Sequence, residues 1–97
     1  MIRIVKMCFK AEHVEDFKAL FEERKHLIRA QEGCTHLELL QDINDPCVFF
    51  TYSFWDAPEY LEQYRNSDFF ADTWSKTKAL FATKAAAWSV AQQVVIA

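Results

Sequence analysis

The sequence predicts a single α+β domain over residues 1–97, built on four antiparallel strands with helices on one face of the sheet. The first observation is length, because 97 residues is the size of one domain. The second is composition: 52% apolar and 15% aromatic residues, with one Gly and two Pro, exclude a disordered or linker-rich chain. The third is periodicity, which changes along the chain in the order strand, helix, strand, strand, helix, strand.

The first half of the chain predicts a strand, a long helix and a second strand. Residues 2–9 are rich in β-branched side chains, and both faces of this segment are largely apolar. Residues 14–31 carry apolar side chains at three-and-four spacing, which indicates an amphipathic helix. Gly33, the only glycine, follows the last turn, where a left-handed residue commonly closes a helix. Residues 35–41 then predict the second strand.

A hairpin and a short helix are predicted next. Residues 47–55 have the composition of a strand, and the turn formers at 42–46 join it to the preceding strand. Asp56 is expected to cap a short helix that ends near residue 65 and contains Pro58 in its first turn.

The last third of the chain predicts a further helix and a final strand over residues 88–96. Ser67 and Asp68 are expected to cap the helix. Its inner face would carry Phe69, Phe70, Thr73, Trp74, Thr77, Leu80 and Phe81. Together, the elements predict the ferredoxin-like βαββαβ arrangement.

The third strand is apolar on both faces, whereas antiparallel sheets normally keep one polar face. One face carries Val48, Phe50, Tyr52 and Phe54, and the other carries Cys47, Phe49, Thr51, Ser53 and Trp55. Only one of them can lie under the chain's own helices, so the second must meet a partner sheet, line a pocket, or both. Several exposed aromatic side chains would form a patch of the size that marks an interface. We therefore expect a homodimer packed sheet against sheet.

Charge, hydropathy and cysteine usage exclude several classes of protein. The net charge is −3, with no basic block that would favour nucleic-acid binding. The longest apolar runs have four residues, far short of the roughly 20 that a membrane helix needs, and the N-terminus has no signal-peptide core. We therefore expect a cytoplasmic protein. Three cysteines without a C-x-x-C pair argue against a disulfide framework, and a single glycine excludes Gly-rich phosphate-binding loops.

A recognisable pattern of residues runs from Glu32 to Phe70. It comprises Glu32-Gly33-Cys34, Glu38-Leu39-Leu40-Gln41-Asp42, Asn44-Asp45-Pro46, the strand from Phe49 to Trp55, Asp56, Glu59-Tyr60-Leu61, Ser67 and Phe69-Phe70. This pattern resembles the antibiotic biosynthesis monooxygenase domain of the dimeric α+β barrel superfamily, and the resemblance spans nearly the whole chain. Members include cofactor-free oxygenases that act on quinols or anthrones, haem-degrading enzymes and enzymes that modify signal molecules.

The resemblance implies a pocket between the sheet and the helices of each subunit. Trp55 matches the tryptophan that ends the family's third strand. The haem-degrading branch has Asn where this chain has Met7 and His where it has Trp74, and other members have His in place of Tyr64 and Phe69. Haem ligation is therefore not supported, and neither a metal nor another cofactor is expected. The expected pocket walls are Met7, Thr51, Ser53, Trp55, Tyr60, Tyr64, Phe70 and Trp74.

The aromatic candidates have a functional and a structural interpretation. Trp55 and Trp74 either hold a planar substrate by stacking or pack as ordinary core residues. Tyr52, Tyr60 and Tyr64 either orient a substrate oxygen or pack with their hydroxyls in water. Tyr60 and Tyr64 are four residues apart and therefore share one helix face.

The smaller polar candidates lie on the predicted strands. Thr51 and Ser53 share the strand face of Trp55 and either bind a substrate oxygen or are satisfied within the sheet or the dimer interface. His36 and Glu38 alternate on one strand face and could act as acid and base or hold a metal. Two ligands are too few for a zinc site, so a solvated or interfacial pair is the simpler interpretation.

Two functional hypotheses follow. In the first, the protein is a monooxygenase without metal or organic cofactor, and a small quinol-like or anthrone-like substrate loses a proton and reacts directly with dioxygen. No residue stands out as its general base, so the catalytic residues are left unassigned. In the second, the protein is a non-catalytic dimeric module that binds a small aromatic or apolar ligand. A polar group with a perturbed pKa beside Trp55 would favour the enzyme, and purely apolar walls would favour the module.

Overall fold

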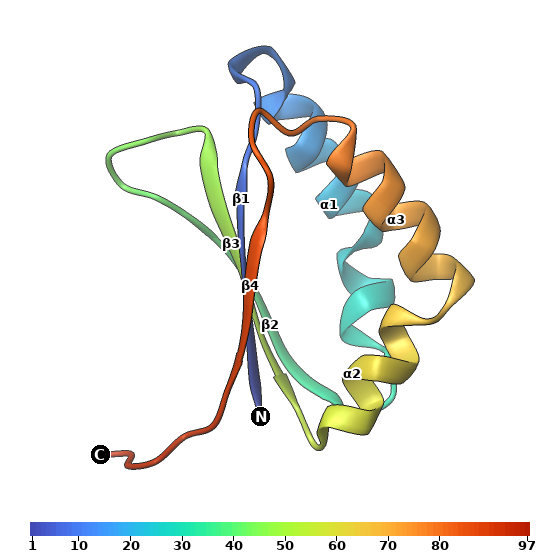
Figure 1. Cartoon of the computed structure of the whole chain (residues 1–97), viewed down its shortest axis with the longest axis vertical. Coiled ribbons are helices and arrows are strands. Elements are labelled where there is room, and N and C mark those ends of the chain that lie inside the picture. Colours follow the sequence, from blue (N-terminus) through green and yellow to red (C-terminus); the bar gives the residue numbers. More distant parts are fainter.

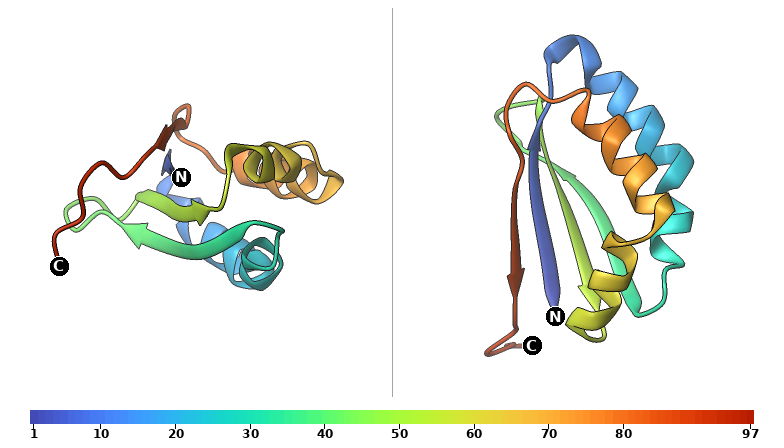
Figure 2. Two further views of the ribbon diagram at one scale, coloured as in Figure 1. Left: turned by 90° about the horizontal axis from the view of Figure 1, so that it is seen from below. Right: turned by 45° about the vertical axis from the view of Figure 1, so that its right-hand side comes forward.

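Four antiparallel strands form one sheet, and the helices cover one of its faces (Figure 1 and Figure 2). The computed structural model describes all 97 residues. Its elements are β1 (Ile2–Cys8), a 3-10 turn η1 (Ala11–His13), α1 (Val14–Arg29), β2 (Cys34–Gln41), β3 (Val48–Trp55), α2 (Pro58–Arg65), α3 (Asp68–Lys78) and β4 (Ala86–Val90). The strand order is β2-β3-β1-β4, and the predicted ferredoxin-like α+β fold is confirmed.

The register of β1 decides which side chains face the helices, because β1 lies between β3 and β4. Val5 is paired with Thr51 on one side and with Ala87 on the other, and Arg3 is paired with Ser53. Side chains that lie directly opposite each other point to the same face of a sheet. The middle of the helix-facing surface is therefore made of side chains that are mostly small.

Large apolar side chains gather at the two ends of that surface. One buried cluster consists of Met7, Phe9, Phe17 and Phe49. The other consists of Cys34, Trp55 and Leu61. The phenylalanine cluster is closely packed, since the rings of Phe9 and Phe17 stack with their centroids 4.0 Å apart. The core is thus divided, and the smaller residues lie between its two parts.

The helices lie where the sequence predicts them, but their ends differ: α1 ends at Arg29 rather than at residue 31, and α3 ends at Lys78, before Leu80 and Phe81. The Ser67 hydroxyl accepts a hydrogen bond from the Phe70 amide at 3.1 Å, which confirms it as the cap of α3. Asp56 does not cap α2: the residue at that position is Ala57, and no side chain bonds to the helix start. The amide of Asp56 instead donates to the Gly33 carbonyl at 2.8 Å, which ties it to the end of the β2–β3 pair. No helix has the length and apolar character that crossing a bilayer requires.

The final strand is shorter than the sequence predicts and begins earlier. β4 covers Ala86–Val90, and residues 91–97 have no regular structure, although residues 88–96 were expected to be extended. The register explains the difference, because Val90 is paired with Ile2, where β1 begins. Beyond this pair no neighbouring strand remains to accept the hydrogen bonds of the chain.

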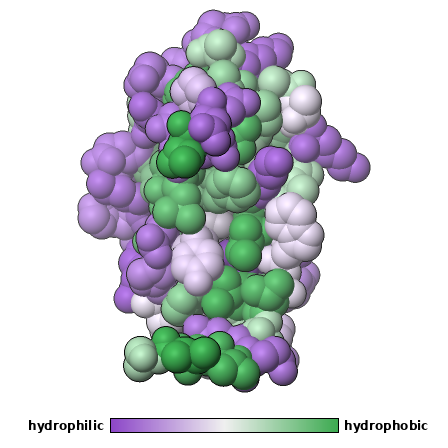
Figure 3. Space-filling view, turned by 90° about the vertical axis from the view of Figure 1, so that its left-hand side faces the viewer, coloured by the Kyte–Doolittle hydropathy of each residue, from purple (hydrophilic) through white to green (hydrophobic).

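The opposite face of the sheet is largely apolar and is not covered by any helix. Phe50, Tyr52 and Phe54 of β3 lie on it, beside Ile4 of β1 and Trp88 of β4. Figure 3 views the molecule from this side: apolar residues extend from the middle to the lower end of the surface, and hydrophilic residues lie mainly at the top and along the sides. The Trp88 side chain is 49% exposed. We call this surface the outer face.

Candidate functional site

A cavity of about 370 Å³ lies between the sheet and the helices, inside the divided core. Nineteen residues line it, and 13 of them are hydrophobic. Its volume lies within the range of small-molecule sites, which are concave, mostly apolar and equipped with a few polar groups. The cavity is therefore the natural candidate for the functional site of this chain.

The hollow arises because the middle of the sheet carries small side chains. Val5 and Thr51 face it from the two central strands, and β4 and the residue before it contribute only Ala85 and Ala87. The bulky side chains of the two core clusters hold the helices away from the sheet at both ends. Small residues at the centre and large residues at the ends thus leave room for a ligand.

The structure brings seven of the eight predicted pocket residues to this cavity: Met7, Thr51, Ser53, Trp55, Tyr64, Phe70 and Trp74. Tyr60 does not line it. Its side chain packs against Gly33 and belongs to the cluster around Cys34, so the expectation for this residue is wrong in position. Binding of a substrate by the other seven stays a prediction.

Trp55 is held rigidly at one end of the cavity. Its indole Nε1 donates a hydrogen bond of 3.0 Å to the Ser53 hydroxyl, and both residues are buried, with 3% and 7% of their surface exposed. The indole also stacks on the Tyr64 ring, with centroids 5.5 Å apart and an interplanar angle of 21°. Because the Ser53 oxygen accepts from the indole, its own proton remains free to be donated.

Aromatic rings continue along the helix side of the cavity. Tyr64 meets Phe70 edge to face with centroids 5.1 Å apart, and Phe70 stacks on Trp74 at 5.9 Å with an interplanar angle of 12°. Trp74 in turn meets Phe81 edge to face. Such a row of rings offers flat, polarisable surface to a planar ligand.

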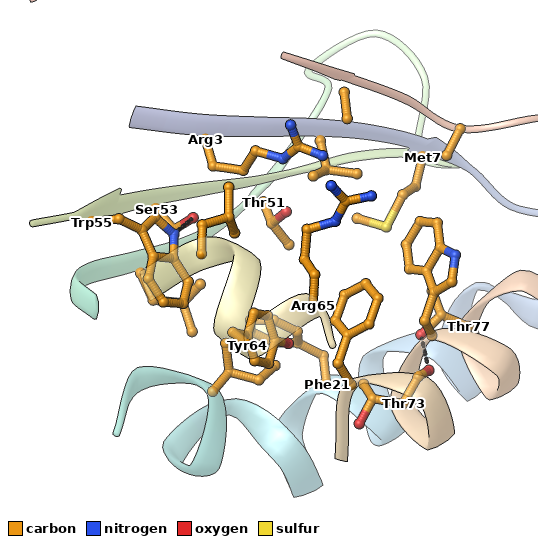
Figure 4. A pocket seen from close by; sticks show the side chains of 18 of the residues that line it. Arg3, Met7, Phe21, Thr51, Ser53, Trp55, Tyr64, Arg65, Thr73 and Thr77 are labelled. Carbon is orange, nitrogen blue, oxygen red and sulfur yellow. Dashed lines mark hydrogen bonds between the residues drawn. The ribbon is translucent and has the colours of Figure 1, made fainter. Parts of the chain in front are cut away.

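Several polar groups enter the cavity among these rings (Figure 4). Burial, with a smaller contribution from the neighbouring Cys34 thiol, raises the pKa of Tyr64 to about 12, so its phenol is protonated at neutral pH and can donate a hydrogen bond. The Thr77 hydroxyl donates to the Thr73 carbonyl at 2.7 Å, and the Thr73 hydroxyl accepts from Arg24 Nη1 at 2.8 Å.

Two arginines also line the cavity, and the sequence analysis missed both. Alternation along β1 places Arg3 on the same face as Val5 and Met7, and this signal could have found it. Arg65, the last residue of α2, follows Tyr64 directly and has no comparable signal, because its long side chain reaches the cavity from the end of the helix.

No Asp, Glu or His is among the residues that line the cavity. His36 belongs to the outer face, where its Nε2 lies 2.6 Å from the Glu38 carboxylate and its ring leans on Phe54. The interpretation of His36 and Glu38 as a pair outside the pocket is thus confirmed. His13 is paired with Asp16 at the start of α1. No three His, Cys, Asp or Glu side chains come together in a group that could hold a metal ion, and no histidine is positioned to ligate a haem in the cavity.

Comparison with known proteins places this geometry in context. The sequence model described as antibiotic biosynthesis monooxygenase matches residues 1–75, which include β1 to β3, α2 and most of α3. No curated protein sequence matches the chain.

Several solved structures share the fold. A protein from Mycobacterium tuberculosis has a TM-score of 0.88 at 14% identity, with 99% of this chain and 97% of that chain covered. A conserved protein from Methanosarcina mazei has a TM-score of 0.83 at 23% identity, with 89% and 86% covered. A structure named antibiotic biosynthesis monooxygenase has a TM-score of 0.83 at 18% identity, with 99% and 100% covered. At these identities the likeness establishes the fold alone.

Proposed function

The chain belongs to the antibiotic biosynthesis monooxygenase family, and on this premise we propose that it oxidises a small planar aromatic substrate, quinol-like or anthrone-like, without a metal or organic cofactor. Membership of the family supports a monooxygenase-like function in general. The observation that carries the finer proposal is the cavity itself, where Trp55 and Tyr64 stack at one end and Phe70 and Trp74 stack along the side.

The chemistry proposed for an anthrone-like substrate needs only the substrate and dioxygen. The ring-bound methylene loses one proton, and the resulting carbanion transfers electrons to dioxygen and forms a carbon–oxygen bond. Loss of the second hydrogen with cleavage of the oxygen–oxygen bond leaves a carbonyl on the substrate and releases one water. One oxygen atom enters the product and the other becomes water, so no external reductant is consumed.

The protein would contribute position, dryness and hydrogen bonds to this reaction. The aromatic walls would hold the ring and exclude water from the carbanion. The protonated phenol of Tyr64 and the free proton of the Ser53 hydroxyl could both stabilise the negative charge that develops on a substrate oxygen. Since no carboxylate or imidazole lines the cavity, no protein group is assigned as the acceptor of the substrate proton, which ends in the water that the reaction releases.

Incorporation of labelled oxygen tests the proposal. The chain is incubated with ¹⁸O₂ and a panel of anthrones and quinols, and we expect one labelled oxygen atom in the product of at least one of them, at a rate above that of spontaneous oxidation. Trp74→Ala, which opens the aromatic wall, should slow this incorporation, whereas Trp88→Phe on the outer face should not. Absence of enzymatic label throughout the panel would overturn the proposal.

A non-catalytic, ligand-binding module of the same fold remains the second candidate. The absence of any Asp, Glu or His from the lining of the cavity favours it, because a dedicated general base is missing. This alternative predicts that an aromatic ligand binds and is recovered unchanged in the labelling experiment.

We further propose that two copies pack through their outer faces. The exposed apolar residues of this region support the proposal: Leu40, Trp88 and Val90 are 42%, 49% and 41% exposed. The apolar tail with Val94 and Ile96 leaves the sheet on the side away from the helices, where a second copy would lie (Figure 1). An uncovered patch of this kind typically marks an interface.

Sedimentation velocity tests the dimer. The native chain should sediment as a dimer, and Trp88→Glu should shift it to the monomer, because a carboxylate would be buried in an apolar contact. Ile43→Glu changes an equally apolar residue that is 96% exposed in the β2–β3 turn, and it should leave the dimer intact. A native monomer at micromolar concentration would refute this proposal.

The cytoplasmic location expected from the sequence stays a prediction.

A further inference from the structure

Two guanidinium groups reach into a cavity that contains no acidic residue. Arg3 enters from β1 and Arg65 enters from the end of α2, and Figure 4 shows both side chains directed into the space between the sheet and the helices. Neither arginine is needed to neutralise a carboxylate there, because no Asp or Glu lines the cavity. Their placement therefore calls for an explanation other than an internal ion pair.

Arg3 makes only one side-chain hydrogen bond. Its Nη1 donates to the Ser89 hydroxyl at 3.0 Å, and no carboxylate lies within ion-pair distance. A guanidinium has five N–H donors, so most of those of Arg3 remain available. Arg65 has one weak carboxylate contact, with Glu62 at 3.8 Å, and 45% of its side chain is exposed.

Arg24 has a structural role, and its contacts differ from those of Arg3 and Arg65. Its Nη1 donates to the Asp72 carboxylate and to the Thr73 hydroxyl, both at 2.8 Å, and its guanidinium lies over the Phe69 ring at 5.8 Å. Its side chain is only 11% exposed and its charge is balanced by a carboxylate. Arg3 has no carboxylate partner and Arg65 has only the long contact with Glu62, although both lie beside a site that could supply a closer one.

The electrostatics of the pair favour an anion. Burial lowers the pKa of Arg3, and the positive charge of Arg65 lowers it further, while Glu62 acts in the opposite direction. Two like charges in a partly desolvated place repel each other, and a negative group between them would remove that cost. Guanidinium groups recognise carboxylates well, because the planar fork of N–H donors matches the two carboxylate oxygens.

We infer that the cavity takes a planar aromatic carboxylate, with its carboxylate held between Arg3 and Arg65 and its ring along Tyr64, Phe70 and Trp74. This inference concerns the same cavity as the proposed function and rests on that function only for the chemistry performed there. It narrows the substrate class, because a neutral quinol or anthrone would give the two guanidinium groups no closely paired anion in the cavity. A carboxylate is ionised at neutral pH, so binding it requires no base from the protein.

Binding of a matched pair of probes tests the inference. By isothermal titration calorimetry, 2-naphthoate should bind the native chain about ten-fold or more tightly than 2-naphthamide, which has the same ring and no charge. Arg3→Met and Arg65→Met should each weaken binding of the naphthoate by about ten-fold and leave that of the amide almost unchanged. Arg65 is exposed at a helix end, so its replacement keeps the test valid even if Arg3→Met disturbs the sheet.

Two controls make the result specific. Lys78→Met removes a positive charge from the exposed end of α3 and should leave both affinities as they are. Arg3→Lys keeps the positive charge but loses the planar pair of N–H donors, so this variant should bind naphthoate with intermediate affinity. Equal affinities of the native chain for the two probes, a preference for naphthoate that survives both methionine variants, or no binding of either probe would overturn the inference.

The outcomes separate this inference from the oxygenase proposal. If naphthoate is preferred through the two arginines but no substrate gains labelled oxygen, the anion site stands and the oxygenase proposal fails. If neutral quinols gain labelled oxygen but naphthoate and naphthamide bind the native chain equally well, the oxygenase proposal stands and the anion site fails.

Discussion

Replacing Ser53 by Ala should destabilise the protein through a single unsatisfied donor. The Trp55 indole N–H is buried, and the Ser53 hydroxyl is its only hydrogen-bond partner, at 3.0 Å. Alanine fills nearly the same space, so packing changes little, but the N–H is left without an acceptor. A buried donor in this state costs about 1–3 kcal/mol. For a domain of this size each kcal/mol corresponds to a fall of about 4–8 °C in Tm.

Urea unfolding of four chains at equal concentration measures the effect: native, Ser53→Ala, Trp55→Phe and the double variant. Trp55→Phe removes the donor, so the serine replacement should cost about 1 kcal/mol less in that background. Ser75→Ala is the matched control, because Ser75 is exposed on α3, and it should change stability by at most about 0.5 kcal/mol. Equal costs of Ser53→Ala with and without the indole would refute the reasoning.

Three further changes test other parts of the structure by urea unfolding. Gly33→Ala should cost more than the roughly 1–2 kcal/mol of a left-handed conformation, since φ is +82° and the new Cβ would lie 2.3 Å from Tyr60 Cγ. Ser67→Ala should lower the free energy of unfolding by about 0.5–2 kcal/mol through loss of the α3 cap, and Ser67→Thr should retain most of this stability. Burial raises the pKa of Tyr64 to about 12, whereas an unfolded tyrosine ionises near pH 10. The contribution of Tyr64 is therefore complete below pH 10 and is lost as pH rises toward 12, and Tyr64→Phe should show a smaller alkaline loss than Tyr52→Phe.

Most of the fold could be predicted from the sequence because local signals and tertiary contacts agree there. The glycine after α1 has the expected positive φ, and the cap of α3 forms as expected. Asp56 is of a residue type that commonly caps helices, but it does not cap α2. Its amide donates to the Gly33 carbonyl, and no local pattern reveals this contact between residues 23 positions apart. Val94 and Ile96 suggest a strand, but β1 begins at Ile2 and offers them no partner. Both errors therefore concern tertiary hydrogen bonds.

The candidate site was predictable where strand alternation defines it. Thr51, Ser53 and Trp55 line the cavity because they share a face of β3. On the short helix α2, a shared face was not sufficient: Tyr64 reaches the cavity, whereas Tyr60, one turn earlier, lies over the only glycine. The helix crosses the end of the sheet, so its two turns meet different surroundings. That crossing depends on tertiary packing and has no signature in residue spacing.

The structure leaves apolar surface open in two places, and their occupants should act on stability in different ways. Only 11 of the 97 residues are buried, because the helices cover one face of the sheet and the cavity interrupts the core beneath them. A ligand in the cavity would raise Tm with ligand concentration, and a second copy on the outer face would raise it with protein concentration.

Two variants should separate these effects. Arg65→Met should reduce the increase in Tm produced by naphthoate to that produced by naphthamide and preserve the dependence on protein concentration. Trp88→Glu should abolish the dependence on protein concentration and preserve the effect of naphthoate if each subunit forms its own cavity. Loss of the naphthoate effect in Trp88→Glu would contradict that independence, and it would mean that the cavity binds its ligand only when the outer face is covered.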